Sequence, residues 1–417
     1  MNSNNNNRYI GIWYNKIVGH NVIWVANRHQ PINGTTGILS ITTNGSLVIT
    51  EGSSTIIWSF ALMTQVINPI AQLLDTGNFI VTSKNDPDKF AWQSFDYPTD
   101  TLIPGMKLGW DVTSGLNRNL TGWSSSTDPS PGNYTLTVDR RGAPQLIFWA
   151  GSFRIWRSGP WTGVTPFNDP YSSNAFVFHF VIKKEEVSYS VSVVNNSILT
   201  RLVVNPSGIA ERFVLLNSGQ WGQYWYGPGS QCDKYGVCGP YGVCNLDKSP
   251  MCSCLPGYEP KFPDHWALMV YSGGCIRKTA LDCRNGTDGF VTVQRILLPD
   301  TVWATVDTRM NLFECRVECL RNCSCSGYAS ADTHEGGSGC IFWFTELVDV
   351  IMYPTGGQDL YLRLAEADIG MYCLLILLSC LLVYIYFVLT IVIQCSLGEV
   401  GLWTENDKVS IVANNTF

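Results

Sequence analysis

The cysteines of this chain are confined to its carboxyl-terminal part, and this distribution restricts what the chain can fold into. Of the 15 cysteines none precedes Cys232, twelve lie between Cys232 and Cys340, and the last three, Cys373, Cys380 and Cys395, lie in or beside an apolar run. An even number of cysteines at this density is typical of a disulfide framework formed in an oxidising compartment, because cytosolic thiols are kept reduced. The sequence therefore predicts an exported, disulfide-bonded region that begins near Cys232.

A zinc module is the alternative interpretation of the same cysteines. Zinc modules commonly use ligand pairs with about two to four intervening residues, often followed by histidines. The pairs Cys252/Cys254 and Cys323/Cys325 have a single intervening residue, and no histidine follows them at ligand spacing. We therefore favour disulfides, and we predict no metal site and no cofactor.

Charge and composition exclude some classes of protein. The 27 lysines and arginines against 33 aspartates and glutamates give a formal net charge of -6, without a basic block. Binding to nucleic-acid phosphates needs clustered positive charge, so we predict no nucleic-acid partner. Aromatic residues make up 12% of the chain, and 38 glycines and 20 prolines supply turns. This composition indicates short strands around an aromatic core, so we predict a mainly β protein.

An uncharged apolar run extends from Ile369 to Ile393, over 25 residues. A helix of this length crosses a hydrocarbon core of roughly 30 Å. A buried helix of a soluble domain would show a polar stripe, and this run has none. The run therefore predicts one transmembrane helix at 369–393 and a short cytoplasmic tail at 394–417, in a single-pass protein of the plasma membrane.

Seven Asn-x-Ser/Thr sequons precede the apolar run, and each is a predicted acceptor of an N-linked glycan. They are Asn33, Asn44, Asn119, Asn133, Asn195, Asn285 and Asn322. Together with the predicted disulfides they place the amino terminus outside the cell. No basic segment followed by an apolar segment opens the chain, so no signal peptide is visible. We expect that the true amino end is missing from this sequence.

A repeat organises the first hundred residues. Trp24, Trp58 and Trp92 are each 34 residues apart, and the segments NGSLVIT (44–50) and TGNFIVT (76–82) lie between them. Each segment has a glycine turn followed by alternating apolar residues, which is typical of a hairpin strand. A repeat of this kind indicates a supersecondary unit packed against copies of itself, so we predict that the tryptophans fill a shared core.

Four segments of this region carry a family resemblance: RYIGIWYNKI (8–17), VIWVANRHQPI (22–32), LLDTGNFIV (73–81) and WQSFDYPTDTLIPGMKLG (92–109). They resemble the bulb-type, mannose-binding-like lectin domain of plant S-domain receptor-like kinases and S-locus glycoproteins. The resemblance implies a three-faced β-prism at 1–115 with an incomplete amino end.

The sugar-binding strand of true bulb lectins reads Q-x-D-x-N-x-V-x-Y, and this chain departs from it. In the second repeat Asn78 matches and Ile80 takes the valine place. The glutamine, aspartate and tyrosine places of the second repeat hold Leu74, Thr76 and Thr82. The five places of the first repeat hold Thr42, Asn44, Ser46, Val48 and Thr50. The carboxylate and the tyrosine are absent from both strands, so Asn78 is left as a weak candidate for carbohydrate binding.

The segment 116–231 contains WRSGPW (156–161) and the alternating stretches 176–182 and 187–194, which predict antiparallel strands. It resembles the S-locus glycoprotein region that follows the lectin domain. Trp156 and Trp161 are predicted to pack in a core or at a domain interface, rather than to form a ligand surface.

The segment 232–275 resembles an EGF-like module, because its cysteine spacing ends in CxC followed by Leu-Pro-Gly-Tyr. The resemblance implies the pairs Cys232–Cys244, Cys238–Cys252 and Cys254–Cys275. A pair of acidic calcium ligands does not precede the first cysteine, so we predict no calcium site.

The segment 283–364 resembles the PAN/apple domain of the same receptors, an α+β fold. The resemblance implies Cys315–Cys340 and Cys319–Cys325, and leaves Cys283–Cys323 as the third pair. Asn311 and Glu314 have the spacing of a capping box, so a short helix is predicted to begin there.

The motifs of the family's serine/threonine kinase domain, which position ATP, metal and base, do not occur in this sequence. We therefore predict no catalytic residues and no enzyme. The resemblance implies a kinase-less receptor-like glycoprotein that recognises an extracellular peptide or carbohydrate ligand, a family role that includes recognition of pollen. Its predicted partners are full-length S-domain receptor kinases, as co-receptor or decoy, or a second copy of itself. The alternatives are a cell-surface carbohydrate-binding lectin and an incomplete, non-functional receptor fragment.

Overall fold

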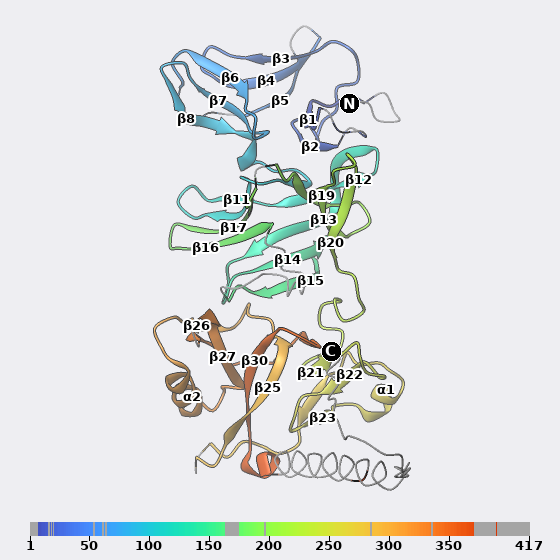
Figure 1. Ribbon diagram of the computed structural model, residues 1–417, viewed down its shortest axis with the longest axis vertical. Coiled ribbons are helices and arrows are strands. Elements are labelled where there is room, and N and C mark those ends of the chain that lie inside the picture. The colour runs from blue at the N-terminus through green and yellow to red at the C-terminus, as the bar shows by residue number, and fades with distance from the viewer. Residues whose placement is uncertain are drawn as a thin grey trace, which may run out of the picture.

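The computed structural model describes residues 7–370 and residue 389, except positions 16, 18, 20, 53, 54, 61, 63, 64, 163–174, 196, 284, 285, 335 and 336. The predicted transmembrane helix lies almost entirely outside the described residues, and the predicted tail lies wholly outside them. Within the described part, no helix is both long and apolar enough to span a bilayer. The described chain forms three β-rich units that follow one another along the long axis of the molecule (Figure 1).

The first unit contains strands β1 to β8 in three small antiparallel sheets. The sheets are β1 (Gly11–Trp13) with β2 (Val22–Val25); β3 (Gly37–Ile41), β4 (Leu47–Glu51) and β5 (Thr55–Ser59); and β6 (Pro69–Leu73), β7 (Phe79–Ser83) and β8 (Asp86–Gln93). A single turn of 3-10 helix, η1 (Ser94–Asp96), follows β8. In the middle strands β4 and β7 alternating apolar residues, Leu47 and Ile49, and Phe79 and Val81, face one shared core, as the sequence pattern predicts.

Three tryptophans occupy the centre of the first unit. Trp24, Trp58 and Trp92 approach each other edge to face, with ring centroids 6.0–6.2 Å apart in all three pairs. Trp24 and Trp92 are buried, and Trp58 is half-buried. The prediction that the 34-residue repeat brings the tryptophans into a shared core is confirmed, because each repeat supplies its ring from the equivalent place in its own sheet.

The second unit contains three antiparallel sheets of four strands each around one core. In sheet order they are β11 (Leu116–Arg118), β10 (Lys107–Asp111), β17 (Glu186–Val193) and β16 (Phe176–Ile182); β12 (Leu120–Ser125), β13 (Asp128–Asp139), β14 (Gln145–Ala150) and β15 (Phe153–Pro160); and β20 (Trp221–Gly227), β19 (Ala210–Leu215), β18 (Thr200–Val204) and β9 (Thr101–Leu102). The predicted antiparallel strands in this region are confirmed. Their arrangement as a second three-faced unit was not foreseen from the sequence.

The third unit is built on one sheet of eight strands. In sheet order they are β22 (Cys252–Cys254), β21 (Gly242–Cys244), β29 (Val350–Met352), β25 (Gly289–Leu297), β30 (Gln358–Leu364), β27 (Gly327–Asp332), β28 (Ser338–Trp343) and β26 (Thr305–Asp307). A ribbon of β23 (Tyr258–Pro260) and β24 (Cys275–Arg277) and the helices α1 (Pro263–Ala267) and α2 (Leu312–Arg321) complete it. Strand β21 pairs parallel with β29, so the predicted EGF-like and PAN segments share this sheet.

Helix α2 begins where the sequence predicts. The side chain of Asn311 accepts a hydrogen bond from the backbone of Glu314, and the Glu314 side chain accepts one from the backbone of Asn311, which is a complete capping box. Cys315 and Cys319 are one helical turn apart on the buried face of the helix. Cys315 is bonded to Cys340 in β28, which fastens the helix to the sheet, and Cys319 is bonded to Cys325 in the loop that leads to β27.

Candidate functional site

The strand that matches the bulb-lectin sugar motif is β7 with the turn before it. Asn78 is only 5% exposed. Its amide nitrogen donates to Gln93 at 2.9 Å, and its amide oxygen accepts from the hydroxyl of Ser94 at 3.2 Å and the backbone N–H of Phe95 at 3.3 Å. The side chain therefore serves to join β7 to the turn after β8. Carbohydrate binding by Asn78 stays a prediction, and a sugar would have to compete with these bonds.

Several other polar side chains at the motif places also have partners within the chain. The hydroxyl of Thr82 donates to the backbone carbonyls of Asp86 and Lys89, each at 2.8 Å. In the first repeat the hydroxyl of Thr42 contacts the Asn44 amide oxygen and accepts from the backbone of Ser46 at 3.0 Å. These hydrogen bonds stabilise turns, and a sugar would have to compete with them.

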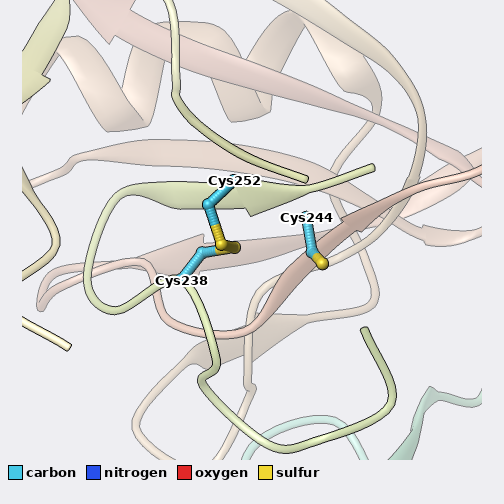
Figure 2. A group of neighbouring side chains, drawn as sticks. All are labelled: Cys238, Cys244 and Cys252. Atoms are coloured by element: carbon cyan, nitrogen blue, oxygen red, sulfur yellow. A yellow bond between two sulfur atoms is a disulfide. The ribbon is translucent and has the colours of Figure 1, made fainter. Parts of the chain in front are cut away.

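Six disulfides lie in the third unit and the segment that enters it. They are Cys232–Cys244, Cys238–Cys252, Cys254–Cys275, Cys283–Cys323, Cys315–Cys340 and Cys319–Cys325, the same pairs that the family resemblance implies. The sulfur atoms of Cys238, Cys244 and Cys252 lie close together, as a metal site would require (Figure 2). All three are bonded to other cysteines, so none is a thiolate that could hold zinc.

The predicted glycosylation sites differ in exposure. Asn33, Asn44, Asn133, Asn195 and Asn322 are exposed, and Asn285 lies outside the described residues. Asn119 is half-buried, and its amide oxygen is sealed from solvent without a partner in the described chain. Glycosylation at all seven positions stays a prediction.

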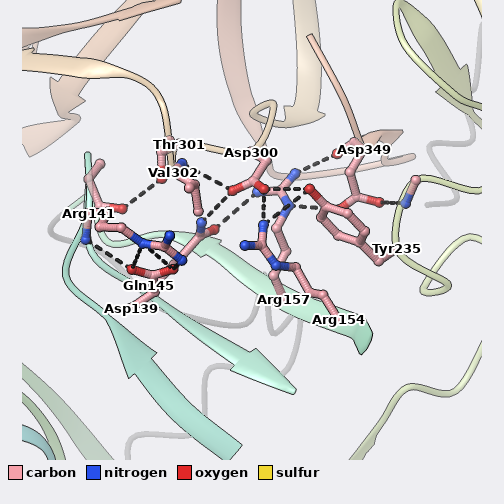
Figure 3. Close-up of polar contacts among 12 residues, drawn as sticks. Asp139, Arg141, Gln145, Arg154, Arg157, Tyr235, Asp300, Thr301, Val302 and Asp349 are labelled. Atoms are coloured by element: carbon pink, nitrogen blue, oxygen red, sulfur yellow. Dashed lines mark hydrogen bonds and ion pairs between the residues drawn. The ribbon is translucent and has the colours of Figure 1, made fainter. Parts of the chain in front are cut away.

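A buried ionic junction joins the second and third units (Figure 3). Arg157, in β15, has a side chain with 0% exposure. Its Nε donates to Asp349 Oδ2 at 2.7 Å, and its Nη2 donates to the backbone carbonyls of Leu298 at 2.7 Å and Asp349 at 2.5 Å. Asp349 Oδ1 in turn accepts from the backbone of Gly236 at 2.7 Å. Burial raises the pKa of Asp349, and Arg157 opposes that rise.

Asp300 is the second carboxylate of the junction. It forms an ion pair with Arg154, accepts from the Tyr235 hydroxyl at 2.5 Å and accepts from the Gln145 amide at 2.7 Å. Burial acts to raise the pKa of Asp300, but Arg157, Tyr235 and Arg154 outweigh it and hold the pKa below its usual value. Burial and Asp300 raise the pKa of Tyr235, so this hydroxyl keeps its proton and donates.

The junction explains the WRSGPW segment. Trp156 packs in the core of the second unit, whereas Arg157 points into the junction and Gly159 contacts Leu297 of the third unit. The sequence predicted core or interface packing for Trp156, and the core placement is confirmed. It did not identify Arg157, because its partner Asp349 is 192 residues away and no local pattern marks the pair.

Comparison with protein families and curated proteins agrees with this arrangement. A family model described as D-mannose binding lectin matches residues 21–124, one described as S-locus glycoprotein domain matches residues 156–262, and one described as PAN-like domain matches residues 283–350. These three regions follow the order of the three units, although the second match runs into the cysteine-rich segment. The EGF-like assignment of 232–275, and the module boundaries given above, stay predictions.

Curated plant proteins are similar over most of the chain. S-locus-specific glycoprotein S6 of Brassica oleracea is 42% identical over 369 residues, which are 87% of this chain and 84% of that protein. Receptor-like serine/threonine-protein kinase SD1-8 of Arabidopsis thaliana is 44% identical over 370 residues, which are 87% of this chain but 43% of that protein. The chain thus spans less than half of the kinase. It belongs to the family of S-locus glycoproteins and S-domain receptor-like kinases.

Proposed function

We propose that the chain is a kinase-less receptor-like glycoprotein that recognises an extracellular ligand and acts as co-receptor or decoy beside complete S-domain receptor kinases. The observation that carries the proposal is the extent of the similarity. The same 87% of the chain covers most of a protein named as a glycoprotein and less than half of a protein named as a kinase. A chain of this kind shares the recognition part of the receptors, and a shared surface is what allows lateral pairing with them.

The proposed location is the plasma membrane, with the amino terminus outside. Six disulfides and the predominantly exposed sequons support an extracellular position of the three units. The uncharged run 369–393 is proposed to anchor them.

A carbohydrate-binding lectin is the second candidate, and the match to the D-mannose binding lectin model favours it. The internal hydrogen bonds of Asn78 and Thr82 argue against mannose binding through the motif strand. A mannose glycan array separates the two functions. A signal that disappears with Asn78→Ala, in a protein that stays folded, would support the lectin and contradict our assignment of these groups to the fold.

The test of the receptor proposal is co-precipitation of the tagged full chain with a full-length S-domain kinase from plant membranes. We expect glycosylated protein in the membrane fraction and association that survives mild detergent. The double variant Leu375→Arg with Leu378→Arg should release the chain from the membrane and abolish the association. The matched control is Leu375→Ile with Leu378→Ile, which should preserve membrane attachment and association. Recovery of the unaltered chain as an unanchored protein without kinase association would overturn the proposal.

A further inference from the structure

An aromatic cleft of about 520 Å³ lies where the first unit meets the second. Its walls include rings of Trp58, Phe60, Trp92 and Tyr97 from the first unit. Phe60 and Trp92 are stacked at 4.6 Å, and Trp92 and Tyr97 are stacked at 5.9 Å, so three nearly parallel rings follow one another. Tyr97 is the outer ring and is 50% exposed. A cleft of this volume fits a small ligand, and the stack offers a flat ring a surface to pack against.

Arg28 supplies a buried positive charge to the wall of this cleft. The side chain is 7% exposed, and its Nε and Nη2 donate to the carbonyls of Pro129, Thr121 and Gly122 at 2.8–3.0 Å. Among the described residues its Nη1 has no hydrogen-bond partner, and no carboxylate forms an ion pair with it. Burial disfavours the charge of this guanidinium, and a bound anion that accepts a hydrogen bond from its Nη1 would stabilise it.

The remaining groups around the cleft also suit an anion. Aspartate and glutamate are absent from its described lining, and His29 adds an exposed imidazole at the edge. Asp100 is a buried carboxylate that acts on Arg28 without forming an ion pair with it; burial raises the pKa of Asp100, and Arg28 opposes that rise. The cleft therefore combines a flat aromatic wall with a guanidinium whose Nη1 has no hydrogen-bond partner among the described residues.

We propose that this cleft binds a six-membered ring that carries a carboxylate, with the ring packed on Tyr97 and the carboxylate bonded to Arg28. Two sources have this chemistry, a uronic-acid sugar and an aromatic carboxylic acid. The site is separate from the motif strand of β7, because none of Asn78, Ile80 and Thr82 lines it. It also goes beyond the proposed receptor role and does not depend on it.

The experiment is calorimetric titration of the full chain in lipid nanodiscs with two matched pairs of ligands. Galacturonate is compared with galactose, and 4-hydroxybenzoate with 4-hydroxybenzyl alcohol. We expect the acid of at least one pair to bind ten times more tightly than its neutral partner, and its affinity to fall as salt is raised. The pair that shows the preference identifies the source. If neither acid is preferred, the proposal is wrong.

Substitution of Tyr97 tests the location without removing the structural bonds of Arg28. Tyr97→Ala should lower the affinity for the preferred acid at least tenfold, because the outer ring of the stack is lost. Tyr226 is the matched control, since it is a tyrosine of similar exposure, 49%, outside the cleft lining. Tyr226→Ala should leave the affinity unchanged. Equal affinity of Tyr97→Ala and the unaltered chain, or equal losses in both variants, would overturn the placement in this cleft.

Discussion

Replacement of Arg157 by methionine tests the junction between the second and third units. Methionine retains much of the apolar length of arginine but removes the guanidinium, and with it the ion pair to Asp349 and the bonds to two backbone carbonyls. The carboxylate of Asp349 then stays buried beside the Gly236 N–H alone. Removing one partner of a buried pair typically costs about 3–5 kcal/mol, and we expect a loss in that range for opening of the junction.

The loss should depend on pH in a defined direction. Burial already raises the pKa of Asp349, and the absence of Arg157 raises it further. The folded state then holds a proton that the unfolded state releases, so stability falls as pH rises from the unfolded pKa through the folded one. Arg157→Met is therefore expected to be less damaging at pH 5 than at pH 7.5. Combining it with Asp349→Asn should recover part of the loss at pH 7.5.

Hydrogen exchange of the full chain in nanodiscs measures this opening locally, in peptides that cover β15 and β29. Arg309→Met is the matched control, because it breaks an ion pair with Asp307 on the surface and should not change exchange at the junction. The reasoning is refuted if Arg157→Met leaves exchange in β15 and β29 unchanged, or if its effect is larger at pH 5 than at pH 7.5.

Two further substitutions test packing. A Cβ on Gly142 would lie 1.7 Å from the carbonyl oxygen of Thr301, whereas Gly52 has nearly the same backbone angle, +62° against +60°, and open space around it. Gly52→Ala should cost about 1–2 kcal/mol from backbone strain alone, and Gly142→Ala should cost more and speed exchange at the junction. Trp92→Ala should lower the free energy of unfolding of the first unit by about 3–5 kcal/mol, measured by denaturant-induced loss of near-ultraviolet circular dichroism. Trp303→Ala, at a 71% exposed position, should have no comparable effect, and similar losses in both would contradict the core assignment.

The sequence predicted those parts of the fold that depend on local pattern. The spacing of Trp24, Trp58 and Trp92 predicted a shared core, because a repeat of constant length returns each ring to an equivalent place. Asn311 and Glu314 predicted the start of α2, because a capping box needs only residues three apart. The cysteine pairs were implied by family resemblance, since spacing alone leaves many connectivities open.

The junction and the three-faced second unit could not be predicted in the same way. The sheets of the second unit join strands that are distant in the chain, such as β9 with β18 and β10 with β17, and no sequence period marks them. Arg157 lies in β15, and only the folded chain brings it to Asp349. Sequence patterns report neighbours along the chain, whereas a buried ion pair between units depends on the complete arrangement of both.

The two contacts between units differ in a way that matters for recognition. At the junction between the second and third units, Asp349 and Asp300 supply carboxylates to Arg157 and Arg154, so these charges are paired within the chain. At the contact between the first and second units, Arg28 donates hydrogen bonds to backbone carbonyls of the second unit, but among the described residues it forms no ion pair with a carboxylate. Arg28 and Tyr97 both belong to the first unit, whereas Thr121 and Pro131 of the second unit also line the cleft. A ligand that fills the cleft would therefore touch both units, and its affinity would then depend on how they are oriented. Ligand binding in the cleft would therefore favour the relative orientation of the first and second units in which the cleft is formed.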